Sequence, residues 1–148
     1  MFFTILFGVI QVVSVFSGVP EVILDTDIGD DIDDTWALML MLGANKVNLK
    51  MIVTSCDDTE TKLLLVAKML EVVKRTDIPI CQGVKLNSKP INQAKWIEGY
   101  SLEHYPGVVH RNGVEKMVEY ILNSKEKVTL CVIGPMMNIA KALEIAPE

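Results

Sequence analysis

The chain has 148 residues, half of them hydrophobic and 6% aromatic, and carries a formal net charge of −5. This length is enough for one domain with a buried core. Because no cluster of lysine and arginine residues offsets the negative charge, the composition excludes a nucleic-acid backbone as partner.

The first 18 residues are uncharged and strongly apolar, and they end in the small residues Ser17 and Gly18. This pattern is typical of a secretory signal peptide, although the usual basic residues at its start are missing. We therefore expect residues 1–18 to be a signal peptide, and the protein to be secreted and to have no stable membrane association after cleavage. Alternatively, this segment is a buried first strand or helix, or an uncleaved membrane anchor. If it is not a signal peptide, the protein is expected in the cytoplasm.

Strand-like and helix-like segments alternate after the leader. Short apolar runs predict buried strands, and apolar residues recurring every three or four positions predict helices. The expected strands are residues 21–25, 47–54, 78–81 and 128–133, and the expected helices are residues 33–43, 59–75, 112–122 and a last one with Pro135 in its first turn. Prolines and glycines interrupt the pattern in residues 87–107, which predicts a long irregular excursion.

This alternation predicts an α/β fold, a doubly wound, mostly parallel sheet with helices on both faces, as in Rossmann-like domains. Four strands are few for such a domain, and the chain stops where a helix should lead into another strand. We therefore expect residues 19–148 to be the N-terminal portion of a truncated domain.

Six aspartates lie within ten residues directly behind the first predicted strand: Asp25, Asp27, Asp30, Asp31, Asp33 and Asp34. Carboxylates at this density repel one another, and a bound cation relieves the repulsion. Ligands that are all oxygen favour a hard ion such as Ca²⁺ or Mg²⁺. Molecules and ions bound by parallel sheets lie beyond the carboxyl ends of the strands, and this cluster follows the carboxyl end of the first predicted strand. The sequence therefore predicts a functional cation site rather than a solvated acidic loop.

Spacing separates two known kinds of cation-binding aspartate motif. An EF-hand loop beginning at Asp25 would need Gly at its sixth position and Glu at its twelfth, where the chain has Asp30 and Trp36, so that loop is excluded. Residues 22–27 also resemble the start of haloacid-dehalogenase-type phosphotransferases, which place a D-x-D pair after their first strand. A Mg²⁺-dependent phosphatase of that type is the alternative enzyme, although it leaves four aspartates unexplained.

The whole stretch of residues 25–34, D-T-D-I-G-D-D-I-D-D, resembles the N-terminal signature of the inosine-uridine-preferring nucleoside hydrolase family. Residues 133–140, I-G-P-M-M-N-I-A, resemble that family's G-P-L-T-N-I-A segment. The resemblance implies hydrolysis of the N-glycosidic bond of ribonucleosides to ribose and free base, with one Ca²⁺ and a water bound to it. An inactive nucleoside- or calcium-binding relic is the alternative that is not an enzyme.

The resemblance also implies roles for the aspartates. Asp27 and Asp34 would be metal ligands, and Asp27 would also be the catalytic general base. Ile133 would lend its main-chain carbonyl to the metal, and Asp25 would support the ligands. Asp33 would bind the ribose hydroxyls.

Further positions receive weaker assignments. Asp57, after the second strand, would contact the substrate or else act as the N-cap of the next helix, and His110 would lie near the base. Asn138 would be structural, and Asp30 and Asp31 receive no role. Members of the family take a further metal-binding Asp and a leaving-group acid from a C-terminal half, so residues 1–148 alone would bind Ca²⁺ poorly. The resemblance leaves a homo-oligomer open.

Overall fold

The computed structural model describes residues 18–147 of the chain. The predicted signal peptide, residues 1–18, therefore lies outside the described residues except for Gly18. None of the helices in residues 18–147 is long and apolar enough to cross a membrane.

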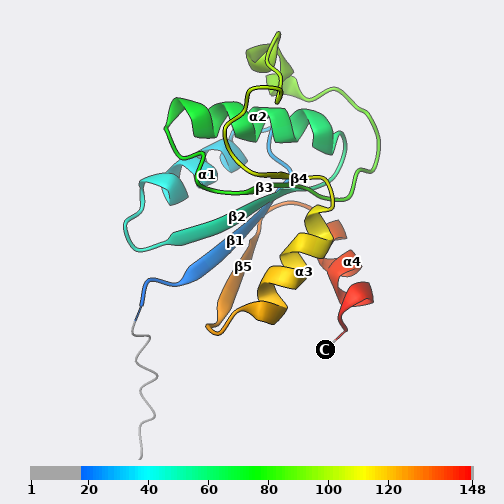
Figure 1. Ribbon diagram of the computed structural model, residues 1–148. Helices are drawn as coiled ribbons and strands as arrows, with labels where there is room; N and C mark the ends of the chain where they lie inside the picture. Colours follow the sequence, from blue (N-terminus) through cyan, green and yellow to red (C-terminus); the bar gives the residue numbers. More distant parts are fainter. Residues whose placement is uncertain (1–17, 148) are drawn as a thin grey trace, which may run out of the picture.

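A parallel sheet forms the centre of the molecule (Figure 1). Over the described residues it contains β1 (Glu21–Thr26), β2 (Asn48–Thr54), β3 (Ile80–Gln82), β4 (Val109–His110) and β5 (Val128–Val132). The strands lie in the order β4-β3-β2-β1-β5, and every neighbouring pair is parallel. The predicted parallel α/β sheet is therefore confirmed. The hydrophobic pattern does not predict β4, because a two-residue strand is too short to show a period.

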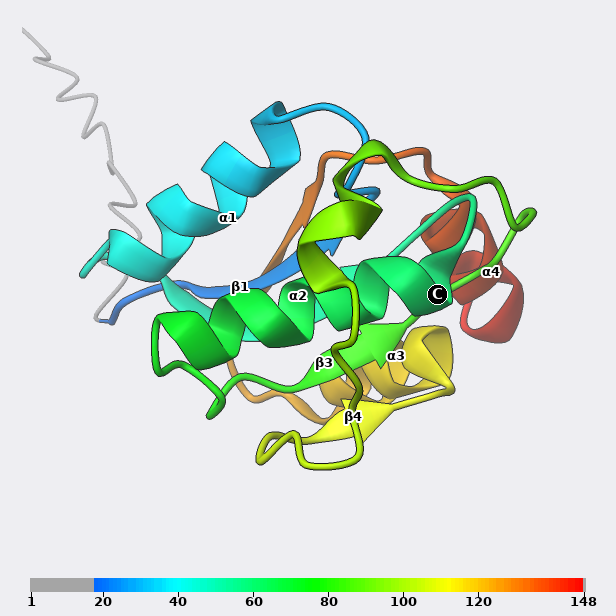
Figure 2. The same ribbon diagram turned by 90° about the horizontal axis from the view of Figure 1, so that it is seen from above.

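Helices cover both faces of this sheet, as predicted (Figures 1 and 2). They are α1 (Asp33–Gly43), α2 (Thr59–Val72), the 3₁₀ helix η1 (Asn92–Ile97), α3 (Gly113–Asn123) and α4 (Met137–Ile145). The α1, α2 and η1 helices pack on one face, and α3 and α4 pack on the other. In β1, Leu24 packs in the core beneath α1, α2 and η1, and Ile23 packs in the core beneath α3 and α4. Successive side chains of a strand point to opposite faces of the sheet.

Two of the expected helix limits are wrong. The α2 helix ends at Val72 rather than at residue 75, because Lys74 takes a left-handed φ of 58° and the N–H of Arg75 bonds back to the Leu70 carbonyl at 2.8 Å. Pro135 lies before α4 rather than in its first turn, and its carbonyl accepts a hydrogen bond from the N–H of Met137 at 2.7 Å. In both places the apolar pattern runs on through residues that form a turn.

The strand order changes direction between β1 and β5. From β1 the chain adds β2, β3 and β4 on one side, and it then returns to place β5 on the other side of β1. Doubly wound sheets bind ligands at this kind of switch point, outside the carboxyl ends of the strands. The acidic loop after β1 and the Ile133-Gly134 turn after β5 both lie there.

Candidate functional site

Asp25 lies near the end of β1 and is completely buried. Asn138, in α4, donates from Nδ2 to Asp25 Oδ2 over 2.7 Å and to the main-chain carbonyl of Thr54 over 3.1 Å. The Asn138 Oδ1 accepts a hydrogen bond from the main-chain N–H of Val84 at 2.7 Å. One buried amide therefore joins the ends of β1 and β2 to the segment after β3, and it fixes one side of the Asp25 carboxylate.

The other carboxylate oxygen of Asp25, Oδ1, is buried and has no hydrogen-bond partner within residues 18–147, and the same holds for Ser55 Oγ. Ser55 lies beside Asp25, close enough to oppose the rise of its pKa, although the two atoms do not reach hydrogen-bond geometry. Buried polar atoms without partners are rare in folded proteins. These two oxygens mark the place where the described residues can accept a further polar group.

Asp34 belongs to α1 but is held by β1. Thr26 Oγ1 donates to Asp34 Oδ1 over 2.6 Å and accepts a hydrogen bond from the main-chain N–H of Ile28 at 3.1 Å. Asp34 and Thr26 are both buried. This pair therefore fixes the first turn of α1 against the end of β1.

Asp27 directly follows β1 and is half-buried. Its main-chain carbonyl accepts a hydrogen bond from Lys62 Nζ, on α2, at 2.6 Å. Gly134 packs against it so closely that a Cβ there would lie 2.8 Å from Asp27 N and 2.7 Å from Ser55 Oγ. The loops after β1, β2 and β5 therefore converge on Asp27.

Asp30 and Asp31 connect the acidic loop to η1. Gly29 turns the loop with a φ of 123°, and its carbonyl accepts a hydrogen bond from the N–H of Gln93 at 2.8 Å. The Asp30 carboxylate accepts one from the N–H of Asn92 at 3.0 Å, and the Asp31 carbonyl accepts one from Gln93 Nε2 at 2.9 Å. The two aspartates without a role in the sequence analysis thus dock the loop onto the 3₁₀ helix.

Burial, with a smaller contribution from neighbouring negative charges, raises the pKa of two of these carboxylates. Burial raises the pKa of Asp25 from 3.8 to about 6, and the negative charge of Asp27 adds to the rise. Burial also raises the pKa of Asp34, and the charges of Asp27 and Asp33 add to it. The charge of Asp27 therefore contributes to the raised pKa of both buried aspartates.

The donors at this edge fit a hard cation in kind, since the carboxylates of Asp25, Asp27 and Asp34 are all oxygen ligands. These carboxylates are, however, too few to form a complete cation site. Within residues 18–147 no group of three or more His, Cys, Asp or Glu side chains is arranged to hold a metal ion. Ca²⁺ takes about six to eight oxygen ligands. The described residues can therefore supply part of a cation site.

Two further residues predicted for the site lie at the same edge. Asp33 is exposed in the first turn of α1, next to Asp34. Ile133 follows β5, and its main-chain N–H donates to the Asp25 carbonyl over 2.9 Å. The structure thus brings together the five residues on which the sequence analysis relied most: Asp25, Asp27, Asp33, Asp34 and Ile133.

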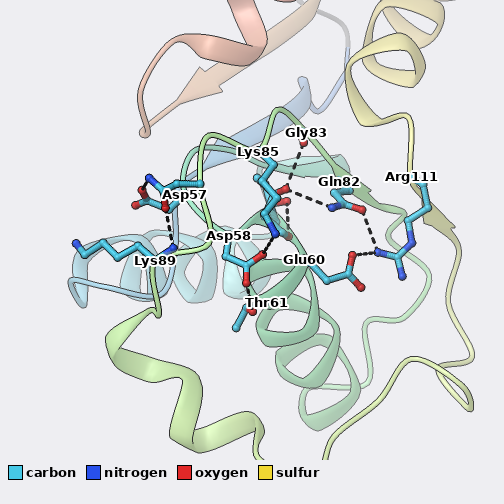
Figure 3. A network of polar contacts seen from close by, with 12 residues as sticks. Asp57, Asp58, Glu60, Thr61, Gln82, Gly83, Lys85, Lys89 and Arg111 are labelled. Atoms are coloured by element: carbon cyan, nitrogen blue, oxygen red, sulfur yellow. Dashed lines mark hydrogen bonds and ion pairs between the residues drawn. The ribbon is translucent and has the colours of Figure 1, made fainter.

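Asp57 lies in a polar network at the start of α2 (Figure 3). Its Oδ1 accepts a hydrogen bond from Asn87 Nδ2 at 2.9 Å, and its backbone has a left-handed φ of 46°. The residue that precedes α2 is Asp58, which pairs with Lys85 Nζ at 2.8 Å. The expectation that Asp57 is the N-cap of this helix is therefore wrong, and its contact with substrate stays a prediction.

His110 lies far from the aspartates. It is in β4, at the opposite edge of the sheet from β5, and pairs with Cys81 in β3. Three strand spacings separate β4 from β1, which corresponds to roughly 14 Å. The structure does not bring His110 to the acidic loop, and its place near a base stays a prediction.

Sequence reasoning missed two residues of the site, Lys62 and Ser55. Lys62 lies one helical turn before Val66, on the buried stripe of α2. A lysine at a position where the helical period predicts an apolar residue is the signal that could have identified it. Ser55 follows β2 directly, and nothing in its sequence neighbourhood distinguishes it.

Comparisons with known proteins agree with this geometry. The sequence profile described as inosine-uridine preferring nucleoside hydrolase matches residues 22–148. A pyrimidine-specific ribonucleoside hydrolase, RihA, of Enterobacter sp. (strain 638) is 34% identical over 140 residues, which cover 86% of this chain and 43% of that protein. A probable uridine nucleosidase of Arabidopsis thaliana is 29% identical, with the same coverage of both chains.

Solved structures show the same fold. The inosine-uridine preferring nucleoside hydrolase of Bacillus anthracis superimposes with a TM-score of 0.68 at 23% identity, over 86% of this chain and 46% of that one. The chain therefore spans less than half the length of the relatives it matches.

The buried amide of Asn138 generates a prediction about stability. Asn138→Ala leaves two groups unpaired, the buried Asp25 Oδ2 and the part-buried N–H of Val84, whereas the Thr54 carbonyl keeps the N–H of Gly83. Each unpaired group costs about 1–3 kcal/mol, so we expect the free energy of unfolding, measured by urea denaturation, to fall by about 2 kcal/mol or more. Asn123→Ala, at an exposed position on α3, should change it by less than about 0.5 kcal/mol. Equal effects of the two substitutions would contradict the role given to Asn138.

The raised pKa of Asp25 generates a prediction about pH. Its carboxyl binds a proton more tightly in the folded protein, so its contribution to stability is fully present below about pH 4 and is lost as the pH rises through about 6. We expect the metal-free wild type to lose up to about 3 kcal/mol relative to Asp25→Asn over this window. Urea denaturation of both proteins in chelator measures the difference, and parallel pH profiles would contradict the raised pKa.

Proposed function

Because the chain belongs to the inosine-uridine preferring nucleoside hydrolase family, we propose that the protein hydrolyses the N-glycosidic bond of ribonucleosides to ribose and free base. The observation that carries this proposal is the convergence of Asp25, Asp27 and Asp34 at the switch point between β1 and β5. The names of the relatives, a uridine nucleosidase and a pyrimidine-specific ribonucleoside hydrolase, support a nucleoside as the substrate.

The site requires a cation, for which we propose Ca²⁺. The carboxylates of Asp27 and Asp34 and the main-chain carbonyl of Ile133 would hold it, with Asp25 behind them. The oxygen-only donors and the unpartnered Asp25 Oδ1 support a hard ion. When bound, such a cation lowers the pKa of water and so makes hydroxide accessible near neutral pH.

The residues of the chain then have distinct tasks. Asp27 accepts the proton of the attacking water at a carboxylate oxygen. Asp33, exposed next to Asp34, accepts hydrogen bonds from the ribose hydroxyls and so orients the sugar. The sugar becomes positively charged as the base departs, as in other glycosidic cleavages, and the clustered carboxylates stabilise that charge.

Neither alternative function is favoured by the comparisons. A haloacid-dehalogenase-type phosphatase would share only the D-x-D start, whereas the nucleoside hydrolase profile matches residues 22–148. The structure also gives Asp30 and Asp31 a use in docking η1, which the phosphatase motif left unexplained. A nucleoside- or calcium-binding relic would keep the same aspartates without turnover, and the assay below separates it.

Asp27 is the decisive residue for the proposed reaction. We expect Asp27→Asn to lower ribose release from uridine and inosine by roughly 10²–10⁴-fold, because it removes the general base. It should also abolish Ca²⁺ binding measured by calorimetry. Asp31→Asn makes the same change of charge at an exposed position of the same loop and should retain both properties.

Three outcomes would contradict this assignment. Turnover that survives Asp27→Asn would remove Asp27 as the base. Release of phosphate from an aryl phosphate with Mg²⁺ would favour the phosphatase. Binding of Ca²⁺ and nucleoside by the wild type without release of the base would favour the relic.

The apolar start of the chain supports a further proposal, that the protein is secreted after removal of residues 1–18. We expect mass spectrometry of the protein from the culture medium to find an N-terminus near Gly18 or Val19. Val12→Arg interrupts the apolar run and should keep the protein in the cell. Retention of the wild type in the cell with its first residues intact would contradict secretion.

A further inference from the structure

Lys62 is buried to a degree that lysine rarely reaches. Its relative exposure is 0%, and it is the fourth residue of α2, which lies across one face of the sheet (Figure 2). Its Nζ donates to the main-chain carbonyl of Asp27 over 2.6 Å. Lysine is almost never fully buried unless it is paired. The position therefore needs a reason beyond packing.

Neither the helix nor the core favours a positive charge at this position. Moving an ammonium group out of water is strongly unfavourable unless an opposite charge compensates it. The first turn of a helix also carries the positive end of the helix dipole, which repels a lysine. A methionine would fill the same space without either penalty, so the compensation must come from the acidic loop.

The acidic loop supplies this compensation at two points. The main-chain carbonyl of Asp27 binds the ammonium directly. The Asp34 carboxylate lies near enough for the charge of Lys62 to oppose the rise of its pKa, which burial and the charges of Asp27 and Asp33 cause. Lys62 thus contacts or lies near both residues whose carboxylates the proposed function assigns to the cation as direct ligands, Asp27 and Asp34.

We propose that Lys62 is a positioning residue of the cation site, a built-in positive charge that holds Asp27 and Asp34 in place while no cation is bound. The inference rests on the proposed function, since it assumes that Asp27 and Asp34 bind a cation. In the metal-free protein the lysine offsets the repulsion among the carboxylates. Once a divalent cation is bound, the same lysine is repelled by it.

This role predicts a coupling between Lys62 and the cation. Lys62→Met should lower the melting temperature of the metal-free protein more than that of the Ca²⁺-saturated protein. The rise in melting temperature on adding Ca²⁺ should therefore be larger in the variant than in the wild type, by roughly 2–8 °C. A lysine that only filled space would lower both melting temperatures equally, and the rise would not change.

Lys68 provides a control of the same residue type on the same helix, at a partly exposed position. Its Nζ also donates to a main-chain carbonyl, that of Trp96 at 2.5 Å, and it lies 4.9 Å from the centre of the Trp96 ring. Trp96 belongs to η1 rather than to the acidic loop. Lys68→Met should therefore lower the melting temperature equally with and without Ca²⁺.

The experiment is calorimetric melting of the whole chain in chelator and in saturating Ca²⁺, for the wild type and both variants. An unchanged Ca²⁺-induced rise in Lys62→Met overturns the inference. If Lys62→Met does not fold in chelator, the double variant Lys62→Met/Asp34→Asn decides, because removing one carboxylate should restore folding if charge was the defect. Failure of that rescue also overturns the inference.

The same experiment tests separately whether Ca²⁺ is the cation. If Ca²⁺ does not raise the melting temperature of the wild type, the assignment of Ca²⁺ is wrong. The comparison of Lys62→Met with the double variant in chelator still tests the charge-balancing role, because it uses no metal. Restored stability in the double variant supports the role, and no restoration overturns it.

Discussion

The burial of neighbouring carboxylates at the end of β1 is the constraint on which the rest of the structure depends. Asp25, Asp27 and Asp34 stand close enough for the charge of one to raise the pKa of the others. Each is held by a group from a different element: Asn138 of α4 for Asp25, Lys62 of α2 for Asp27 and Thr26 of β1 for Asp34. Elements from both faces of the sheet are therefore engaged in keeping one acidic loop in place.

These restraints explain why the site is already ordered in the described residues. The amide of Asn138 also binds the end of β2 and the segment after β3, so one side chain restrains all three segments. Gly134 lets the turn after β5 approach Asp27 more closely than any side chain would permit. A cation entering such a site would find its first ligands pre-positioned and would lose less free energy to ordering them.

The number of ligands connects the structure to the length of the relatives. In the proposed cation site, two carboxylates and one main-chain carbonyl would supply only part of the roughly six to eight oxygens that Ca²⁺ prefers. The matched region covers 86% of this chain but only 43% of the uridine nucleosidase and of the RihA relative.

The sequence by itself determined the alternation of strands and helices, the acidic loop at the end of β1 and the family to which its motif belongs, because each is written in neighbouring residues. It could not show that Asn138 binds Asp25, 113 residues away, or that Lys62 lies beneath Asp27. It also did not show β4, or that His110 lies three strands away from β1. Only the tertiary structure decided these points, because the direction in which each crossover turns sets which strands become neighbours, and that direction is not encoded in any local hydrophobic period.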